Sequence, residues 1–397
     1  MGEVSFNPMD PEFVADPYPM YHRLRAEDPV HRSPLGFWVL TRYEDVVSVL
    51  RDPRFAKEAI ATFVAQKLGV ESASGIGISM LDRDPPDHTR LRSLVSKAFT
   101  PRVVEGLRPR IQQIVDGLLD QAEDRRAMDV IEDFAYPIPV IVICEMLGVP
   151  VEDHERFRGW SLDLARGLDA TLLGAGADLA QRARSSRLAL ADYFRELIAD
   201  RGQAPRGDLL SALIAAEEAG DKLSEQELLA TCILLLVAGH ETTVNLLGNG
   251  TLALLRHPDQ LALLRDQPGV IVGAVEELLR YDGPVQRTAR VPSTDAVIDG
   301  HAIRAGEMVM PFIGAADRDP AHFPEPDRLD LKRGDNRHVA FGMGIHFCLG
   351  APLARLEGQI AINTLVRRFP KLALATDRPE YRQSLTLRGL TSLPVAF

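Results

Sequence analysis

The stretch from Phe341 to Gly350 reads FGMGIHFCLG, and it runs directly into APLAR at residues 351–355. Glycine at positions 342, 344 and 350 gives access to backbone conformations closed to other residues, so the chain can turn tightly beneath a flat ligand. Pro352 is typical of the first turn of a helix, where its missing N–H costs nothing. The pattern predicts a glycine-rich turn that ends at a helix N-terminus.

Cys348 lies just before this predicted helix. The unpaired N–H groups and the dipole at a helix N-terminus favour an anion, here the thiolate form of cysteine. The arrangement suits a single sulfur ligand to a metal. A structural cysteine in a tight turn and a zinc site are the alternatives, but zinc needs three or four ligands and only His346 lies near. Cys144 and Cys232 fall in apolar helical stretches and are expected in the core.

The 397-residue chain has the composition of soluble globular protein, with 46% hydrophobic and 25% charged residues. Its 45 basic and 56 acidic residues give a net charge of −11, which argues against a nucleic-acid partner. Three cysteines cannot form a disulfide framework and fit a reducing compartment. No targeting pattern opens the chain, and the longest apolar run, 228–238, is far shorter than the ~20 residues of a membrane span. We therefore expect a cytoplasmic protein without a membrane segment.

Helical periodicity dominates the chain, with helices expected through 89–281 and again at 351–368. Short strand patterns are confined to 28–41, 296–310 and 382–396. Residues 318–340 carry several prolines and charges and are predicted to form a long irregular connection. The prediction is a mainly α fold with small β-sheets, arranged as one large domain over 1–397. Within it the individual helices are expected at 139–147, 154–166, 178–200, 208–217, 258–266, 270–281 and 351–368.

A long central helix is predicted from a capping box at Ser224–Glu227 to about Arg256, some ~50 Å at 1.5 Å per residue. Its middle reads AGHETT at residues 238–243. A glycine, an acid and two threonines are poor helix chemistry, and such a conflict is expected at a functional site. The alternative is a glycine that only admits a neighbouring helix. A zinc-protease HExxH motif fails because position 244 is Val.

Together these residues resemble the cytochrome P450 family of haem-thiolate monooxygenases. FGMGIHFCLG is similar to the family's haem-binding loop, a highly specific ten-residue pattern, and other family signatures follow in order along the whole chain. The resemblance implies the cytochrome P450 fold, with haem b between the long central helix and the helix that follows Cys348. It implies that Cys348 is the proximal iron ligand, whose thiolate promotes O–O cleavage, and that Phe341 packs beside the sulfur.

The resemblance also implies the catalytic residues. Thr242 would hydrogen-bond the dioxygen being cleaved and Glu241 would relay protons from solvent, at a point where the family's helix is locally widened. The implied reaction inserts one oxygen atom from O2 into a lipophilic small molecule, by hydroxylation or epoxidation. A peroxide-using peroxygenase or an isomerase of the same fold is one alternative, but both typically lack this acid–alcohol pair. A non-enzymatic haem sensor is the other, although no output module is evident.

Further positions match the family's structural and haem-binding residues. Glu277 and Arg280 form an ExxR pair, weak evidence alone because such pairs are common on helix surfaces. The resemblance implies that Arg328 completes this pair and that the three hold the proximal side together. His88 and Arg92 lie four residues apart on one helix face, where they would hold haem propionates. The implied haem contacts are His88, Arg92, Ala238, Arg290, Phe341, His346, Cys348 and Gly350.

By family position the substrate pocket would be lined by Val237, Val285, Gln286 and Leu387. Residues from 57–80 and 166–182 would also contribute to its lining. These segments are largely apolar, which suits a lipophilic substrate. The chain has no flavin-binding region and no iron–sulfur cysteine set, so electrons from NAD(P)H would arrive through a separate ferredoxin and its reductase. We expect a monomer with a local basic patch for an acidic ferredoxin. The candidate arginines are Arg102, Arg108, Arg110, Arg337 and Arg355.

Overall fold

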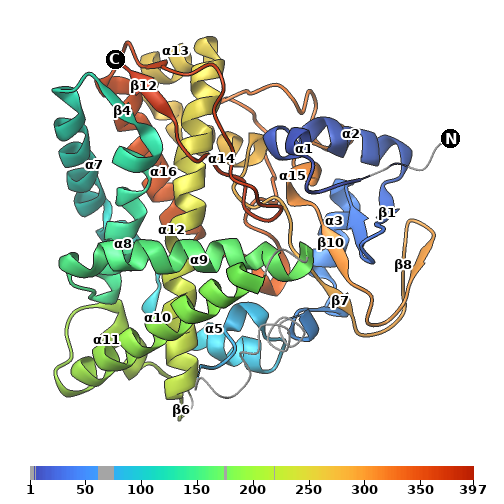
Figure 1. Ribbon diagram of the computed structural model, residues 1–397, viewed down its shortest axis with the longest axis horizontal. Helices are drawn as coiled ribbons and strands as arrows, with labels where there is room; N and C mark the ends of the chain where they lie inside the picture. Colours follow the sequence, from blue (N-terminus) through green and yellow to red (C-terminus); the bar gives the residue numbers. More distant parts are fainter. Residues whose placement is uncertain (1–3, 5, 61–75, 174–176, 219) are drawn as a thin grey trace. The chain divides into compact units, whose positions relative to one another are not determined.

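The computed structural model describes residues 4, 6–60, 76–173, 177–218 and 220–397. It divides into two compact units. Unit 1 comprises Met1–Ala56, Pro109–Tyr136 and Thr242–Phe397, and unit 2 comprises Lys57–Arg108 and Pro137–Glu241. Helix α12 (Glu225–Arg256) is continuous through the boundary and is drawn in yellow in Figure 1. The mainly helical fold with small sheets is as predicted, while the single domain stays a prediction.

Unit 2 is built almost entirely of helices. Its largest helix–helix contact joins α9 and α10, and α11 packs on both α5 and α8. α8 is apolar on nearly every side and accordingly buried, which is the pattern of a core helix. The elements of this unit, besides the first half of α12, are η1 (Met80–Asp82), α5 (Asp87–Ala98), α6 (Pro101–Gly106), α8 (Pro137–Leu147), η3 (Val151–Asp153), α9 (His154–Leu173), α10 (Ala177–Gln203), α11 (Leu209–Ala215), β5 (Glu217–Glu218) and β6 (Asp221–Lys222).

Unit 1 joins helices from both ends of the chain. α14 and α13 both pack on α16, the helix that follows the cysteine loop. Gly358 of α16 lies close to Leu246 of α12 and to Val275 of α14, where a Cβ would stand 3.3 Å from the leucine methyl. The helices are α1 (Pro11–Ala15), α2 (Tyr18–Glu27), α3 (Tyr43–Arg51), α7 (Arg108–Glu123, from Pro109 onward), the π-helical turn η2 (Val130–Ala135), α13 (Pro258–Asp266), η4 (Pro268–Val270), α14 (Ile271–Tyr281), α15 (Ile313–Ala316), η5 (Gly344–His346) and α16 (Ala351–Arg368).

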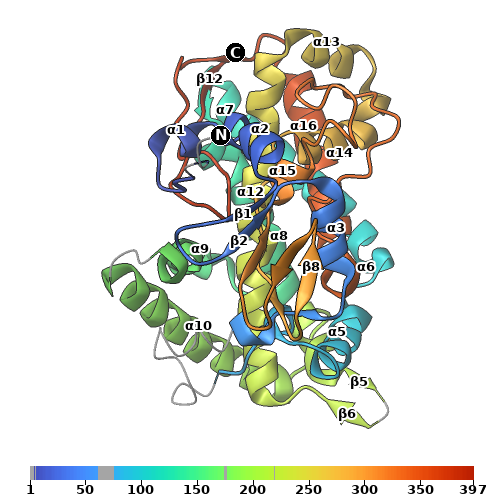
Figure 2. The same cartoon turned by 90° about the vertical axis from the view of Figure 1, so that its right-hand side faces the viewer.

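The sheets of unit 1 are small. In the order β1-β2-β10, the first pair is antiparallel and β10 joins β2 in parallel, with Met310 opposite Val39. Figure 2 shows this sheet beside α3, and an apolar core that includes Leu40, Val46 and Val309 fills the space between them. The strands are β1 (Val30–Arg32), β2 (Trp38–Leu40), β3 (Phe55–Ala56), β4 (Ala127–Asp129), β7 (Val291–Pro292), β8 (Ala296–Ile298), β9 (His301–Ile303), β10 (Val309–Pro311), β11 (Ala373–Leu374) and β12 (Pro394–Ala396).

The long helix α12 begins as predicted. Glu227 N–H donates to Ser224 Oγ at 3.3 Å, and Ser224 N–H donates to a Glu227 carboxylate oxygen at 2.8 Å, so the capping box is confirmed. By length and composition α12 could cross a membrane, and it is the one such helix among the described residues. About two thirds of its most apolar window is buried inside the protein, as in a core helix.

Most of the predicted elements are present, and the differences have local causes. The irregular stretch 318–340 is confirmed and contains no helix or strand. The strand pattern at 382–396 is largely wrong, because only β12 forms a strand and the rest makes single bridges such as Val285 with Leu387. Helix α9 runs to Leu173, well past the predicted end at 166. Part of the predicted substrate segments, 61–75 and 174–176, lies outside the described residues.

Candidate active site

The cysteine loop is closed by its own backbone. Cys348 N–H donates to the carbonyl of Phe341 at 3.0 Å, and Phe347 N–H donates to that of Gly344 at 3.1 Å. Gly342 and Gly344 both have φ of +69°, the left-handed region that favours glycine. A Cβ on Gly344 would also stand 2.5 Å from the carbonyl oxygen of Leu50 in α3. The loop therefore needs glycine at these positions, as the sequence indicated.

Cys348 is half-buried, and its thiol is not part of a disulfide. Gly350 is the N-cap of α16 and offers no side chain to the first N–H groups of the helix, and Pro352 occupies the first turn. The positive end of α16 is therefore left for the cysteine sulfur. No group of three or more His, Cys, Asp or Glu side chains within the described ranges is placed to hold a metal ion. The donor set at this loop fits a group bound through one thiolate, as haem is, and does not fit a protein-ligated zinc.

A charged network supports the loop beside the sulfur. The Arg355 guanidinium stacks 4.6 Å above the Phe341 ring and donates to both carboxylate oxygens of Glu276, at 2.8 and 2.7 Å. His338 lies 3.1 Å from the same carboxylate. Burial alone would raise the pKa of Glu276, but the bonds from Arg355 and His338 outweigh it and lower that pKa to about 2. Sequence reasoning missed Glu276 and His338, because nothing in their spacing indicates that they meet.

The centre of α12 carries the predicted acid–alcohol pair as two consecutive residues. Glu241 is buried, and its carboxylate lies 3.6 Å from Nε2 of His240, whose Nδ1 lies 2.8 Å from the Leu236 carbonyl. Thr242 is half-buried, whereas Ala238, one turn earlier, is exposed in the middle of a largely buried helix. This face of α12 is open at the residues predicted to face dioxygen and haem. The expected widening is not seen, because α12 is α-helical at every residue.

The ExxR pair is a buried ion cluster whose third arginine differs from the prediction. Arg280 donates two hydrogen bonds of 2.8 Å to Glu277, and both side chains are fully buried. Arg333, not Arg328, completes it, with Nε 3.1 and 3.2 Å from the Glu277 oxygens. Arg328 instead pairs with Glu325 and is 59% exposed, although its carbonyl accepts from Arg280 and Arg333. The assignment of Arg328 was therefore wrong.

Glu357 of α16 is a second buried carboxyl that the sequence did not single out. It is 1% exposed, and neither carboxylate oxygen has a partner in hydrogen-bonding geometry among the described residues. Burial raises the pKa of Glu357 to about 8, and the nearby Thr243 hydroxyl on α12 opposes this shift only in part. The Glu357 side chain is therefore mostly neutral at pH 7, and Thr243, the residue near it on α12, directly follows Thr242.

Replacing Glu357 with Gln is expected to flatten the pH dependence of stability. The folded-state pKa of about 8 lies above the unfolded value of roughly 4.3, so the wild-type protein loses stability as pH rises through this window. The gain of Glu357→Gln over wild type should grow with pH, to at most about 5 kcal/mol above pH 8. Denaturant unfolding at pH 5, 7 and 8.5 measures it, with the exposed Glu44→Gln as control. A difference that does not change with pH would contradict the assigned burial.

The predicted haem-propionate residues occur in both units. In unit 2, His88 and Arg92 lie on α5; burial and the Arg92 charge lower the pKa of His88. In unit 1, Arg290 is buried between β7 and the preceding turn, where it donates to Thr288 Oγ1 at 3.1 Å. His346 is half-buried in η5.

The predicted substrate residues also occur in both units. Val285 and Leu387 are brought together by an antiparallel bridge in unit 1, and both are half-buried. Val237 lies half-buried on the α12 segment of unit 2. Gln286 differs from the expectation, because its amide accepts from Tyr21 at 3.0 Å and donates to the Gly283 carbonyl at 2.8 Å. The first bond ties Gln286 to α2 and the second to the chain just before it, which gives Gln286 a structural role.

An open cleft of about 390 Å³ lies beside the cysteine loop in unit 1. Of the arginines expected to form a basic patch, Arg337 is bound to Asp335 and Arg355 to Glu276, which cancels most of their charge. Arg51, which the sequence did not single out, adds a cation at the cleft. The cleft is lined by Tyr43, Val47, Arg51, Glu276, His322, Asn336, Arg337, His338, Phe341, Met343, Phe347 and Arg355.

Comparison with known proteins gives one consistent answer. The family model "Cytochrome P450" matches residues 177–394. The polyketide biosynthesis cytochrome P450 PksS of Bacillus subtilis is 44% identical over all of this chain and 99% of that protein. Cytochrome P450 107B1 of Saccharopolyspora erythraea is 48% identical over 97% of this chain and 96% of that protein. The solved structure of P450BioI, in complex with an acyl carrier protein that carries hexadec-9Z-enoic acid, has 43% identity and a TM-score of 0.90 over 98% of this chain and 99% of that chain.

The family model covers more than half of the chain, and the relatives are of nearly equal length and more than 40% identical to it. The glycine-rich cysteine loop and the uncapped helix that follows it agree with this family. Two independent features, the buried ExxR cluster and the acid–alcohol pair in mid-helix, agree as well. The chain belongs to the cytochrome P450 family.

Proposed function

We propose that this protein is a monooxygenase in which Cys348 is the thiolate ligand of haem b and a lipophilic small molecule is the substrate. The observation that carries the proposal is the placement of a single half-buried thiol at the uncapped N-terminus of α16, inside a loop that only glycine allows. Haem held by Cys348 would supply the oxygen-activating chemistry of a reaction in which one atom of O2 enters a C–H or C=C bond and the other leaves as water, with two electrons and two protons consumed.

The chain's own residues would deliver those protons. The Thr242 hydroxyl would donate a hydrogen bond to dioxygen, and the buried carboxylate of Glu241 would pass protons to it from solvent. Nε2 of His240 lies 3.6 Å from this carboxylate, and a protonated imidazole there would stabilise its negative charge. The presence of both members of the pair favours the monooxygenase over the peroxygenase, the isomerase and the haem sensor.

The remaining haem contacts are proposed by family position. His88, Arg92, Arg290 and His346 would supply cations or hydrogen bonds to the propionates, because an acidic chain must provide local positive groups. Ala238 would lie over the haem face, and Phe341 and Gly350 would flank the sulfur. The exposure of Ala238 and the stacking of Arg355 on Phe341 support these two placements.

Electrons would come from NAD(P)H through a ferredoxin and its reductase, which are typical partners of bacterial members of the family. We propose that an acidic ferredoxin uses the cleft beside the cysteine loop, where Arg51 offers a cation and Phe347 is 41% exposed. We also propose that the protein works in the cytoplasm as a monomer.

The substrate is proposed to contact Val237, Val285 and Leu387, which are apolar and half-buried. Relatives named for lipophilic substrates support this class. A vitamin D(3) 25-hydroxylase of Pseudonocardia autotrophica is 46% identical over 96% of this chain, and a solved myxobacterial relative holds myristic acid.

The carbon monoxide difference spectrum of the reduced protein tests the proposal directly. Thiolate ligation gives a strongly red-shifted Soret band, which we expect. A globin-like band would exclude Cys348 as the ligand, and a purified protein that takes up no hemin would exclude the haem.

Thr242→Ala is expected to leave haem binding intact but to divert reducing equivalents to hydrogen peroxide. Loss of the hydroxyl removes a group that supports proton delivery. General acid catalysis of this kind raises the rate of the catalysed step by at least about 10²-fold. Product formed per NAD(P)H consumed should fall by about tenfold or more, measured with a substrate found by a ligand-induced spin-state screen. Thr251→Ala, a fully buried threonine nine residues further along the same helix, is the control. Unchanged coupling in Thr242→Ala would overturn the assigned role.

A further inference from the structure

Two buried asparagines follow Thr242 on α12. Asn245 and Asn249 are 2% and 1% exposed, and they lie three and seven residues after Thr242, so all three share one helix face. Burying an amide costs free energy unless its polar atoms are hydrogen-bonded. The partners of these two side chains therefore indicate what each one holds in place.

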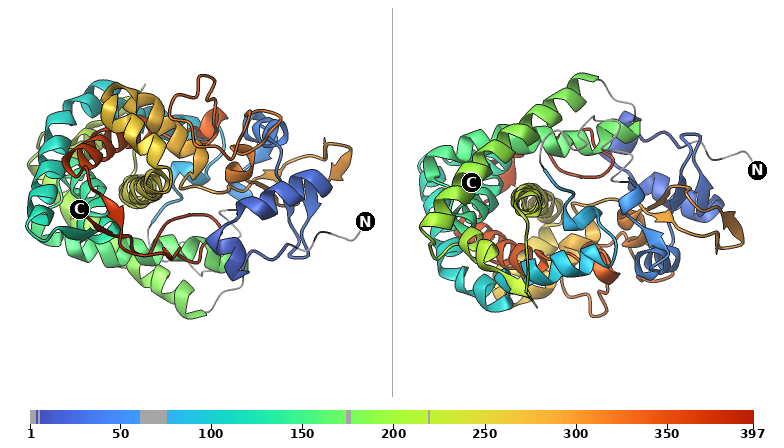
Figure 3. Two further views of the ribbon diagram at one scale, coloured as in Figure 1. Left: turned by 90° about the horizontal axis from the view of Figure 1, so that it is seen from above. Right: turned by 90° about the horizontal axis from the view of Figure 1, so that it is seen from below.

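Both asparagines hold the turn formed by residues 382–389, which lies in unit 1 with them. Asn249 Nδ2 donates to the Arg388 carbonyl at 3.1 Å and to the Asp282 carbonyl at 3.2 Å. Asn245 Oδ1 accepts from Arg382 at 3.3 Å. A Cβ on Gly389 would stand 1.9 Å from Asn245 Oδ1, so only glycine lets the turn lie this close to α12. Figure 3 shows the C-terminal segment, in dark red, passing beside α12.

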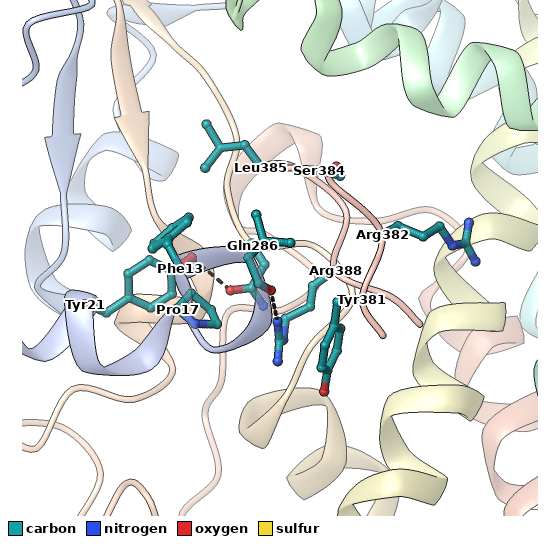
Figure 4. Close-up of a pocket in the computed structure, with 10 residues that line it drawn as sticks. Phe13, Pro17, Tyr21, Gln286, Tyr381, Arg382, Ser384, Leu385 and Arg388 are labelled. Atoms are coloured by element: carbon teal, nitrogen blue, oxygen red, sulfur yellow. Dashed lines mark hydrogen bonds between the residues drawn. The ribbon is translucent and has the colours of Figure 1, made fainter. Parts of the chain in front are cut away.

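The opposite side of the turn is held by Arg388. Its guanidinium donates to Asp282 at 2.6 Å and to the carbonyls of Val14 and Ala15 at 3.0 Å each, and Tyr18 donates to the same Asp282 oxygen at 2.7 Å. Arg388 is buried, so this is a buried charge pair in which each guanidinium nitrogen has an acceptor. In Figure 4 Arg388 extends toward the N-terminal residues and Tyr381, whereas Leu385 points away from them.

The backbone of the turn is fixed as well. Gln286 N–H donates to the Thr386 carbonyl at 2.9 Å, and Arg388 N–H donates to the Pro284 carbonyl at 2.8 Å. Between these bonds Val285 faces Leu387 across the bridge. The bridge therefore fixes Val285 and Leu387, the two proposed substrate contacts, relative to each other. The two asparagines in turn fix the turn that carries Leu387 relative to α12.

We infer that Asn245 and Asn249 are positioning residues for substrate recognition, which hold the 382–389 turn in register with Thr242. A rise of 1.5 Å per residue puts Asn245 about 4.5 Å along the helix axis from Thr242. Displacement of the turn would move Leu387 relative to the residue proposed to meet dioxygen. The inference rests on the proposed function, because it takes Leu387 and Val285 as substrate contacts.

A pair of matched ligands tests this inference without knowledge of the natural substrate. 1-Methylimidazole and 1-dodecylimidazole coordinate haem iron through the same ring nitrogen and differ only in the alkyl arm, which would occupy the substrate pocket. Both dissociation constants are measured on the haem-loaded full chain by optical titration. The ratio of the two reports how well the pocket receives an apolar chain.

Asn249→Ala removes both hydrogen bonds to the turn. We expect 1-dodecylimidazole to bind about tenfold more weakly, as loss of two bonds of ordinary strength allows, with 1-methylimidazole unchanged. Asn363→Ala on α16 changes the same side chain away from the turn and should leave the ratio at the wild-type value. An unchanged ratio in Asn249→Ala, or an equal loss for both ligands, would overturn the inference.

Arg382→Met keeps the inference testable if Asn249→Ala does not fold, because Arg382 is only half-buried and its loss removes the bond to Asn245. We expect 1-dodecylimidazole to bind about threefold more weakly to Arg382→Met, and an unchanged ratio would count against the inference.

The wild-type protein separates the inference from the proposed function on which it rests. A wild-type chain that binds both ligands equally would refute the lipophilic pocket of the proposed function, whereas a dodecyl preference that survives in the variants refutes only the asparagines' role.

Discussion

Replacing Cys348 with serine is expected to abolish the red-shifted carbon monoxide band and monooxygenase turnover. A serine hydroxyl has no thiolate character, even at the N-terminus of α16 where the helix dipole favours an anion. The electron donation that promotes O–O cleavage would be lost with the sulfur. The reduced carbon monoxide spectrum and the turnover of the hemin-loaded variant measure the effect, which should be at least about 10³-fold in rate, or about 4 kcal/mol in the barrier.

The other two cysteines provide matched controls. Cys144 and Cys232 are completely buried, and burial raises the pKa of each thiol to about 12, so both are neutral core residues. Cys144→Ala and Cys232→Ala should keep the red-shifted band, with only the modest stability loss of a small core truncation. If Cys348→Ser retains that band, or if a control loses it, the assignment of the haem ligand is wrong.

Arg333→Ala is expected to cost about 3–5 kcal/mol in the free energy of unfolding and to impair haem uptake. The Arg333 side chain is 10% exposed and its Nε bonds the fully buried Glu277, which also accepts from Arg280 and from Asp330 N–H. Removing one partner of such a cluster leaves a buried charge poorly compensated. Denaturant unfolding and the fraction of protein that takes up hemin provide the two measurements.

Arg328→Ala is the matched control for this cluster, since it makes the same change five residues earlier. Its side chain bonds only the exposed Glu325 among the described residues, so the expected change is within about 0.5 kcal/mol. Equal losses in the two variants, or a larger loss in Arg328→Ala, would contradict the cluster as the structure shows it.

Local patterns in the sequence were sufficient for the features that depend on near neighbours. The capping box at Ser224 predicted the start of α12, and the glycines around Cys348 predicted a tight turn before α16. Both depend on contacts within about ten residues, where spacing alone fixes which groups meet. The same holds for the ExxR pair, because residues three apart share a helix face.

Contacts between distant segments depended on the tertiary structure. Arg328 and Arg333 look alike in sequence, and the path of the irregular 318–340 stretch decides which of them reaches Glu277. Gln286 accepts a hydrogen bond from Tyr21, and Glu357 is buried away from water. Both outcomes depend on segments that are distant in the sequence. Hydrogen bonding and desolvation at these residues are set by chain segments tens to hundreds of positions away, which residue type and local periodicity do not encode.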